Sequence, residues 1–199
     1  CLNIINHAHV TLYADDTTIV MSHSNSNFLQ TICDDTTNQI SRWFSHNGLY
    51  LNKTKTHYLR FHQKNIQFNL DNIKCHIRNS PISRTPSVNF LGLVLVDRLN
   101  WHLHCEKIVG KLSKTCYLLR NIRHLFSLDH LLMIYYGQVE SYLRYGICFW
   151  GFSSGAQDIF IAQKRIIRVM LNIPQRCSCK NIFKKLNVLT LSSLYIYEI

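Results

Sequence analysis

The chain has 199 residues, of which 47% are hydrophobic, and a formal net charge of +11. This composition excludes a disordered chain, and no apolar run approaches the roughly 18 residues of a membrane span. The length suffices for one large or two small domains, and the start at Cys1 shows no secretory leader, so we expect a truncated intracellular protein.

The charge is distributed unevenly along the sequence. Residues 1–41 contain four Asp and no Lys or Arg, whereas the remainder contains all 22 basic residues and seven acidic ones. An acidic segment beside a strongly basic body predicts a metal site next to a surface that binds a polyanion. The alternative is a basic composition that serves solubility alone.

The first predicted element is a tight hairpin over residues 9–21. Its ends are rich in β-branched and apolar residues, and Asp15 and Asp16 stand at its tip. Two carboxylates about 4 Å apart repel by about 1 kcal/mol in water and about 4 kcal/mol near a protein surface. A divalent cation such as Mg²⁺ converts this repulsion into affinity. Ordinary turn chemistry is the alternative interpretation of the two aspartates.

A helix is predicted next. Ser24 to Asn27 form a polar break, the apolar residues from Phe28 to Phe44 recur at helical spacing, and Asn47-Gly48 forms a left-handed cap. The helix contains Asp34-Asp35-Thr36-Thr37, which repeats the tetrapeptide at Asp15. Adjacent side chains on a helix diverge by about 100°, so we expect this second pair to be solvated surface and not a metal site.

Extended segments are predicted between residues 49 and 96. They comprise strands on either side of a polar turn at 52–55, a second hairpin over 66–77 and, after a loop at 80–86, one apolar strand over 88–96. A glycine inside the last strand allows the close approach of another backbone or of nucleic acid.

From Trp101 onward the pattern is helical. An apolar stripe runs through the first helix at Ile108, Leu112, Cys116, Leu119 and Ile122. Further helices are predicted over 128–143, over 156–171 and, as two short ones, within 181–198. Lys107, Lys111 and Lys114 recur on a second face and span about 10 Å, which suits successive phosphates, although a solvated charged face is the common alternative.

The eight cysteines do not show the paired spacing of a zinc site. They stand at positions 1, 33, 75, 105, 116, 148, 177 and 179, and Cys177-x-Cys179 is too tight for a zinc knuckle. They are expected to be buried or incidental thiols in a reducing compartment. His102, His104 and Cys105 could bind a metal, but no fourth ligand is evident.

The sequence resembles the reverse transcriptases of non-LTR (LINE-type, jockey-like) retrotransposons across nearly its whole length. Four blocks, in order, carry the resemblance: Tyr13-Ala14-Asp15-Asp16; Trp43 to Asn52 with Lys55-Thr56; Phe90-Leu91-Gly92 with Asp97, Leu99, Trp101 and His104; and Tyr145-Gly146, Trp150-Gly151 and Gln163-Lys164-Arg165.

The resemblance implies an α+β fold and an enzymatic activity. Residues 1–98 would be part of a right-hand polymerase palm, built of antiparallel hairpins and a helix, residues 99–146 an all-helical thumb, and residues 147–199 a C-terminal helical extension. The implied activity is RNA-directed DNA synthesis in the cytoplasm or nucleus, with an RNA template, a DNA primer and deoxynucleoside triphosphates. No membrane is implied.

The resemblance also implies residue roles. Asp15 and Asp16 would be metal ligands of a site with two Mg²⁺ ions. Lys55 would lie near the nucleotide phosphates or donate a proton, and Tyr13 and Ala14 would lie at the primer end. The remaining nucleic-acid contacts would come from Phe90, Leu91, Gly92, Lys107, Lys111 and Lys114.

One departure from the family is severe. Such polymerases take another essential aspartate from an earlier palm strand and bind nucleotides with a fingers region, whereas residues 1–12 contain no Asp or Glu. We therefore expect a fragment that is inactive without an N-terminal fingers and palm segment. The alternatives are a catalytically silent relic that binds nucleic acid and a domesticated protein-interaction fold.

Overall fold

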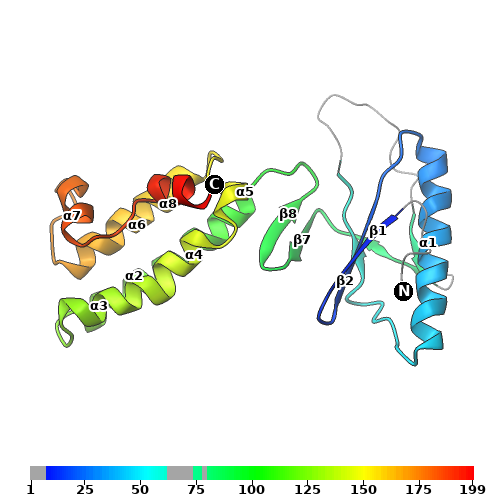
Figure 1. The fold of residues 1–199 in the computed structure, drawn as a ribbon, viewed down its shortest axis with the longest axis horizontal. Coiled ribbons are helices and arrows are strands. Elements are labelled where there is room, and N and C mark those ends of the chain that lie inside the picture. Colours follow the sequence, from blue (N-terminus) through cyan, green and yellow to red (C-terminus); the bar gives the residue numbers. More distant parts are fainter. Residues whose placement is uncertain (1–7, 62–73, 78–79) are drawn as a thin grey trace. The chain divides into compact units, whose positions relative to one another are not determined.

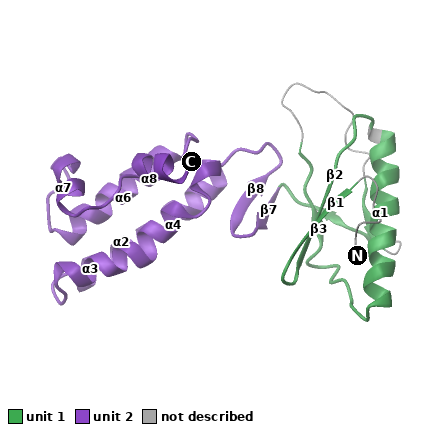
Figure 2. Cartoon of the chain, viewed as in Figure 1, with its two compact units in different colours: residues 1–86 green, residues 87–199 purple. Residues whose placement is uncertain are grey.

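A computed structural model describes residues 8–61, 74–77 and 80–199. The chain divides into two compact units, unit 1 (Cys1–Pro86) and unit 2 (Ser87–Ile199), which Figure 2 colours separately. Helices and short strands are both present, which confirms the α+β class in its coarse form. The division between the units falls before residues 87–96, whereas the sequence had suggested a boundary near residue 98.

Unit 1 begins with the predicted hairpin (Figure 1). Strands β1 (Ala8–Tyr13) and β2 (Asp16–Met21) are antiparallel, and Tyr13 pairs with Asp16, so Ala14 and Asp15 form a two-residue turn. Ala14 has a φ of +52°, a left-handed conformation that tight hairpin turns require and that costs an L-residue some backbone strain. The hairpin prediction is confirmed.

Helix α1 (Ser26–His46) also forms as predicted. The Asn25 side chain accepts a hydrogen bond from the Asn27 amide at 2.9 Å and caps the first turn. After the last turn Gly48 takes the left-handed conformation at φ +69°. The buried face contains Cys33, Thr36, Thr37, Ile40 and Ser41.

The rest of unit 1 contains short strand pairs. Strand β3 (His57–Tyr58) runs parallel to β6 (Ser83–Arg84), and β4 (His76–Ile77) runs antiparallel to β5 (Ser80–Pro81). The predicted loop at 80–86 was therefore wrong in part, because these residues pair with partners that local sequence does not identify. Most of the hairpin predicted over 66–77 lies outside the described residues.

Unit 2 begins with a hairpin where the sequence predicted one strand. Strands β7 (Ser87–Phe90) and β8 (Leu93–Val96) pair antiparallel, with Leu91 and Gly92 in the turn between them. Both turn residues have a positive φ, +45° and +83°, as a two-residue hairpin turn demands. The sequence did not predict this turn, because residues 88–96 are almost continuously apolar.

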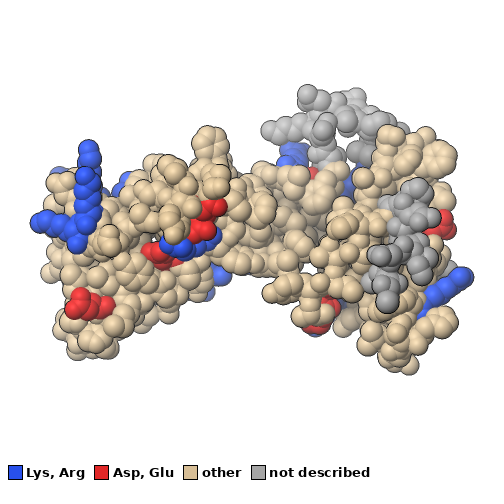
Figure 3. Space-filling model, viewed as in Figure 1, with Lys and Arg blue, Asp and Glu red and all other residues tan. Residues whose placement is uncertain are grey.

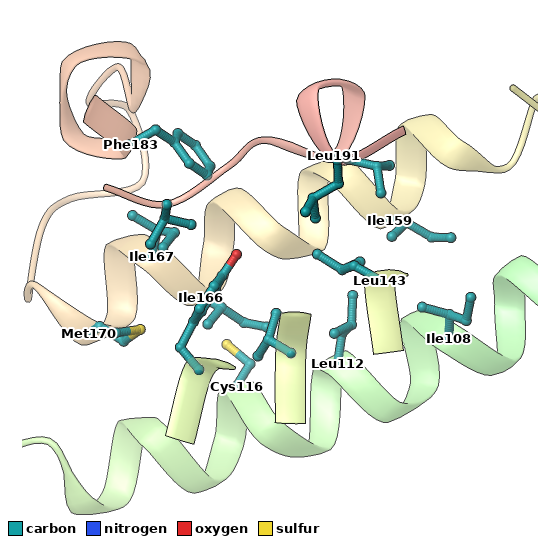
Figure 4. Packing of buried hydrophobic residues seen from close by; sticks show 14 of the residues in the cluster. Ile108, Leu112, Cys116, Leu143, Ile159, Ile166, Ile167, Met170, Phe183 and Leu191 are labelled. Carbon is teal, nitrogen blue, oxygen red and sulfur yellow. The ribbon is translucent and has the colours of Figure 1, made fainter. Parts of the chain in front are cut away.

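Helices make up the rest of unit 2. They are α2 (His102–Ile122), α3 (Leu128–Ile134), the π-helical stretch η2 (Tyr135–Glu140), α4 (Ser141–Arg144), α5 (Ile147–Trp150), α6 (Ala156–Met170), α7 (Lys180–Lys185) and α8 (Leu191–Glu198). The predicted helix over 128–143 is thus a helical path with a π-helical middle, and it ends before Gly146, whose φ is +63°. Helices α2 and α6 pack along each other and run in the same direction (Figure 4).

The helices of unit 2 share one core, which confirms the predicted stripe on α2. Ile108, Leu112, Cys116 and Leu119 are buried, and Leu112 and Leu119 are completely inaccessible. Burial of such a side chain stabilises the fold by about 1.5–3 kcal/mol. Residues after Gly146 enter this same core through α5, α6, α7 and α8. No helix within the described ranges is long and apolar enough to cross a membrane.

Candidate metal site and nucleic-acid interface

Asp15 and Asp16 lie at the tip of the β1–β2 hairpin. Asp15 occupies the turn, Asp16 begins β2, and both side chains are exposed. Within the part of the chain that the structure describes, neither carboxylate has a hydrogen bond or an ion pair. Tyr13, which precedes the turn, is 64% exposed. Among the described residues, the turn therefore presents two carboxylates without a polar partner to solvent.

Within the described residues, the two carboxylates do not belong to a larger group of potential metal ligands. Among residues 8–61, 74–77 and 80–199, no group of three or more His, Cys, Asp or Glu side chains is arranged to hold an ion. This includes His102, His104 and Cys105, the set that the sequence offered without a fourth ligand. The hard oxygen donors of Asp15 and Asp16 nevertheless suit Mg²⁺, which proteins often bind through one or two carboxylates together with water and substrate phosphates.

The repeated aspartate pair on α1 has a different environment. Asp34 accepts a hydrogen bond from Gln30 Nε2 at 2.8 Å, and its carboxylate lies 3.9 Å from His76 Nδ1. Asp35 is exposed on the same helix. Asp34 is therefore half-buried and already engaged, so the predicted solvated position is confirmed for Asp35 and is wrong for Asp34.

The two lysines after α1 differ in their engagement. Asn52 Oδ1 accepts hydrogen bonds from the Thr54 amide and hydroxyl and organises the turn. Lys53 Nζ donates to Ser80 Oγ at 2.8 Å, whereas Lys55 is exposed and its ammonium makes no polar contact within the described residues. Lys55 is thus the better placed of the two for an anionic ligand. No hydrogen bond or ion pair in the described ranges joins it to Asp15 or Asp16.

The β7–β8 turn is held by Tyr145. The Tyr145 hydroxyl donates a hydrogen bond to the Leu91 carbonyl. A Cβ atom on Gly92 would lie 3.2 Å from the Tyr145 ring, so the glycine permits this close approach. Phe90 is half-buried at the end of β7. These contacts give Leu91 and Gly92 a structural role, and any role in binding nucleic acid comes in addition.

His104 joins the same cluster from α2. Its Nδ1 accepts a hydrogen bond from the Val94 amide at 3.3 Å, and its ring lies 6.0 Å from those of Trp101 and Trp150. Burial lowers the pKa of His104, and the positive charges of Lys107 and Lys111 lower it further. Trp150 Nε1 in turn donates to the Tyr145 carbonyl at 3.0 Å. Motif residues far apart in the sequence thus form one cluster.

The three lysines of α2 are all exposed, but they are not equally free. Lys107 Nζ donates to Asn89 Oδ1 at 2.8 Å, and Lys111 Nζ lies 4.5 Å from the centre of the Tyr142 ring. The Lys114 ammonium makes no such interaction within the described residues. Lys114 is therefore the member of the row whose charge is fully available to a polyanion.

A second basic group was missed by the sequence reasoning. Lys180, Lys184 and Lys185 are exposed on α7, and Figure 3 shows basic side chains gathered at that end of unit 2. The sequence does show three lysines within six residues at this place. The basic composition of the whole chain made this local cluster easy to overlook.

Gln163 has a structural role within the last motif block. It is completely buried, its Nε2 donates to the Tyr135 hydroxyl at 2.8 Å and to the Leu189 carbonyl at 2.9 Å, and its Oε1 accepts from the Leu191 amide at 3.0 Å. These bonds connect α6 with η2 and with the start of α8. Its amide is fully used in joining these elements.

Comparisons of the chain with protein-family models, with curated proteins and with solved structures find no match.

Proposed function

We propose that this chain is the palm and thumb part of a non-LTR-type reverse transcriptase, an RNA-directed DNA polymerase. Its partners would be an RNA template, a DNA primer, deoxynucleoside triphosphates and an N-terminal segment that supplies the fingers and a further carboxylate. The observation that carries the proposal is the Tyr13–Asp16 turn, where two carboxylates stand exposed on a tight hairpin and have no polar partner among the described residues.

The chemistry of the turn fits nucleotidyl transfer. Bound Mg²⁺ would activate the primer 3′ hydroxyl and hold the triphosphate, which stabilises an in-line transition state. Asp15 and Asp16 would hold the metal through oxygen, and the small side chain of Ala14 would leave room for the primer end. The exposed ammonium of Lys55 would bind a phosphate oxygen or donate a proton to the leaving group.

The charge distribution supports a polyanionic partner. Unit 2 contains 14 of the 22 basic residues and six of the 11 acidic ones. Lys114 on α2 and the three lysines of α7 are exposed, and they provide the positive charge that phosphates require.

The metal site can be tested with Mn²⁺, which broadens the amide resonances of residues near its binding site. We expect Mn²⁺ to broaden residues 13–17 at lower concentration than residues 34–37, which carry the same Asp-Asp-Thr-Thr tetrapeptide on α1 and serve as an internal control. Asp15→Asn should remove the effect at the hairpin, and Asp35→Asn should leave it. Equal broadening of both tetrapeptides would reject a specific site at the hairpin.

A second candidate function is binding of nucleic acid without catalysis. It is favoured by the observation that the described residues contribute only two carboxylates to the hairpin. On this ground we expect no primer extension by the 199-residue chain with Mg²⁺ or Mn²⁺. In a longer polypeptide that supplies the third carboxylate, Asp15→Asn or Asp16→Asn should abolish synthesis, and retained synthesis would remove these residues from the site.

Salt dependence separates both candidates from a protein-interaction fold. Phosphate contacts release counterions, so affinity for a primer–template hybrid should fall steeply as salt rises. An affinity that stays flat between low and high salt would exclude nucleic-acid binding through the basic surface and leave the interaction fold.

A further inference from the structure

Unit 1 contains a buried pair of thiols that the proposed function does not use. Cys33 comes from the middle of α1, and Cys75 directly precedes β4. Each is only 5% exposed, and together they form the centre of the unit's hydrophobic cluster, with Met21, Leu29, Tyr58 and Ile82 packed around them. Their side chains are hydrogen-bonded to each other, and both cysteines are in the thiol state.

Contacts made by neighbouring residues hold the segments that contain Cys33 and Cys75 next to each other. On one side, Gln30 Nε2 donates a hydrogen bond to the Lys74 carbonyl at 2.7 Å, and Gln30 Oε1 accepts one from the Lys74 amide at 2.8 Å. On the other side, Asp34 Oδ1 lies 3.9 Å from His76 Nδ1. The residues before and after each cysteine therefore fix α1 against the segment that contains Cys75, which keeps the sulfur atoms together.

We propose that Cys33 and Cys75 are an oxidation site, at which a hydroperoxide converts the two thiols into an intramolecular disulfide. The proposal is independent of the proposed polymerase function, because it uses neither the hairpin carboxylates nor the basic surface. Hydrogen peroxide is small enough to reach a buried pair after a local opening of the cluster, and no other protein is required for the reaction.

The hydrogen bond between the thiols makes them chemically unequal. The Cys75 thiol donates to the Cys33 sulfur, which lowers the pKa of Cys33 and raises the pKa of Cys75, an increase to which burial also contributes. The nucleophile in cysteine oxidation is the thiolate. Cys33 is therefore the residue that reacts first with peroxide, and Cys75 resolves the product.

The reaction balances with peroxide as the only oxidant. The Cys33 thiolate attacks one peroxide oxygen, the O–O bond breaks, and the products are a sulfenic acid on Cys33 and one water after proton transfer. The Cys75 sulfur then attacks the Cys33 sulfur and the S–O bond breaks. The departing hydroxide takes the Cys75 proton and forms a second water, so two thiols are oxidised and one peroxide is reduced.

The disulfide would join α1 to the residue directly before β4. Within the described residues, unit 1 has the smaller apolar cluster of the two units. The disulfide would close the chain between residues 33 and 75 and reduce the conformational freedom of the unfolded state. Oxidation would therefore stabilise unit 1, and excess thiol would reverse the change. In a reducing compartment such a bond is transient, which suits a sensor of oxidant more than a permanent cross-link.

The test uses the full 199-residue chain with Cys148→Ser and Cys177→Ser, which remove the exposed thiols of the described residues. The protein is treated with hydrogen peroxide, its remaining thiols are alkylated, and it is digested without reductant for mass spectrometry. We expect a peptide pair linked through Cys33 and Cys75 that separates on treatment with dithiothreitol. The midpoint temperature of the thermal unfolding of unit 1 should rise on oxidation by about 10 °C or more.

Single variants supply the controls. Cys33→Ser and Cys75→Ser should each abolish the linked peptide, whereas Cys116→Ala, at a buried cysteine of unit 2, should keep it. With Cys75→Ser we expect a sulfenic acid on Cys33 that dimedone traps. The proposal is overturned if Cys33 links to another cysteine, if both thiols are converted to sulfinic acid without a link, or if they stay reduced while Cys148 of the parent chain is oxidised.

Discussion

At the scale of single residues, two glycines of unit 2, Gly146 and Gly110, have different roles. Gly146 has a positive φ, and a Cβ there would lie 2.9 Å from Leu93 Cδ2. Gly110 lies within α2, and a Cβ at that position would meet nothing within 4 Å. The first glycine permits a turn and a close contact, whereas the second only weakens a helix.

Replacement of these two glycines should have opposite effects on stability. Gly146→Ala forces alanine into a left-handed conformation against Leu93 and should lower the free energy of unfolding by about 1–3 kcal/mol. Gly110→Ala should raise it by about 0.5–1 kcal/mol. Denaturant titration of both variants measures the difference, and a Gly146→Ala protein as stable as Gly110→Ala would show that the turn adapts.

His104 should make stability depend on pH. Because burial, Lys107 and Lys111 lower its pKa below the ordinary 6.5, the unfolded chain takes up a proton at a higher pH than the folded chain does. The contribution of neutral His104 is therefore complete above pH 6.5 and is lost as the pH falls through the lowered pKa. His104→Gln should flatten the fall in stability between neutral and acidic pH.

The control for this experiment is His124→Gln, which removes an exposed imidazole. Both variants are unfolded with denaturant at several pH values between 5 and 8. If His104→Gln and the parent chain lose stability in parallel as the pH falls, His104 is not responsible for the pH dependence.

At the scale of elements, α2 combines two functions on separate faces. One face supplies the apolar stripe that packs against α6, and the other presents the three lysines to solvent. The lysines do not form a uniform row, because Lys107 is bound to Asn89 and Lys111 lies over Tyr142. Their contributions to phosphate binding should therefore differ.

Lys114→Ala should change the salt dependence of nucleic-acid binding most. Removal of one phosphate contact lowers the slope of log affinity against log salt by about 1. We expect a smaller change for Lys107→Ala, since its ammonium already has a protein partner, and none for Ser113→Ala on the same helix. Identical slopes in all three variants, measured by fluorescence anisotropy on a labelled hybrid, would place the phosphate contacts elsewhere.

At the scale of the whole molecule, the two units differ in how much apolar surface they bury. Within the described residues, the apolar cluster of unit 1 is centred on Cys33 and Cys75, whereas unit 2 has a large core built from seven helices and the π-helical stretch. Since burial of apolar surface is the main favourable contribution to folding, unit 2 should be the more stable of the two.

Unfolding should therefore occur in two steps. Denaturant should unfold unit 1 first, and amide hydrogen exchange should be slower in α2 and α6 than in α1. Tryptophan fluorescence separates the steps, because Trp43 reports unit 1 and Trp101 and Trp150 report unit 2. In Trp43→Phe only the later transition should remain, and coincident transitions from both units would contradict independent folding.

The elements whose signals are local were predictable from the sequence. The β1–β2 hairpin, the caps of α1, the stripe of α2 and the short closing helices follow from periodicity and from capping residues a few positions apart. The position of Asp15 and Asp16 at a hairpin tip belongs with them, because a two-residue turn between alternating strands is itself a local feature.

Other features depended on contacts between residues far apart in the chain. The sequence pattern alone did not predict that residues 87–96 form two strands or that β3 pairs with β6. It also did not predict the contact of Tyr145 with Leu91 or that of Cys33 with Cys75. Nor could it distinguish Lys53, which donates to Ser80, from Lys55, whose ammonium has no polar partner among the described residues. The tertiary structure decided these points, because each depends on which distant side chain fills the space next to a given residue.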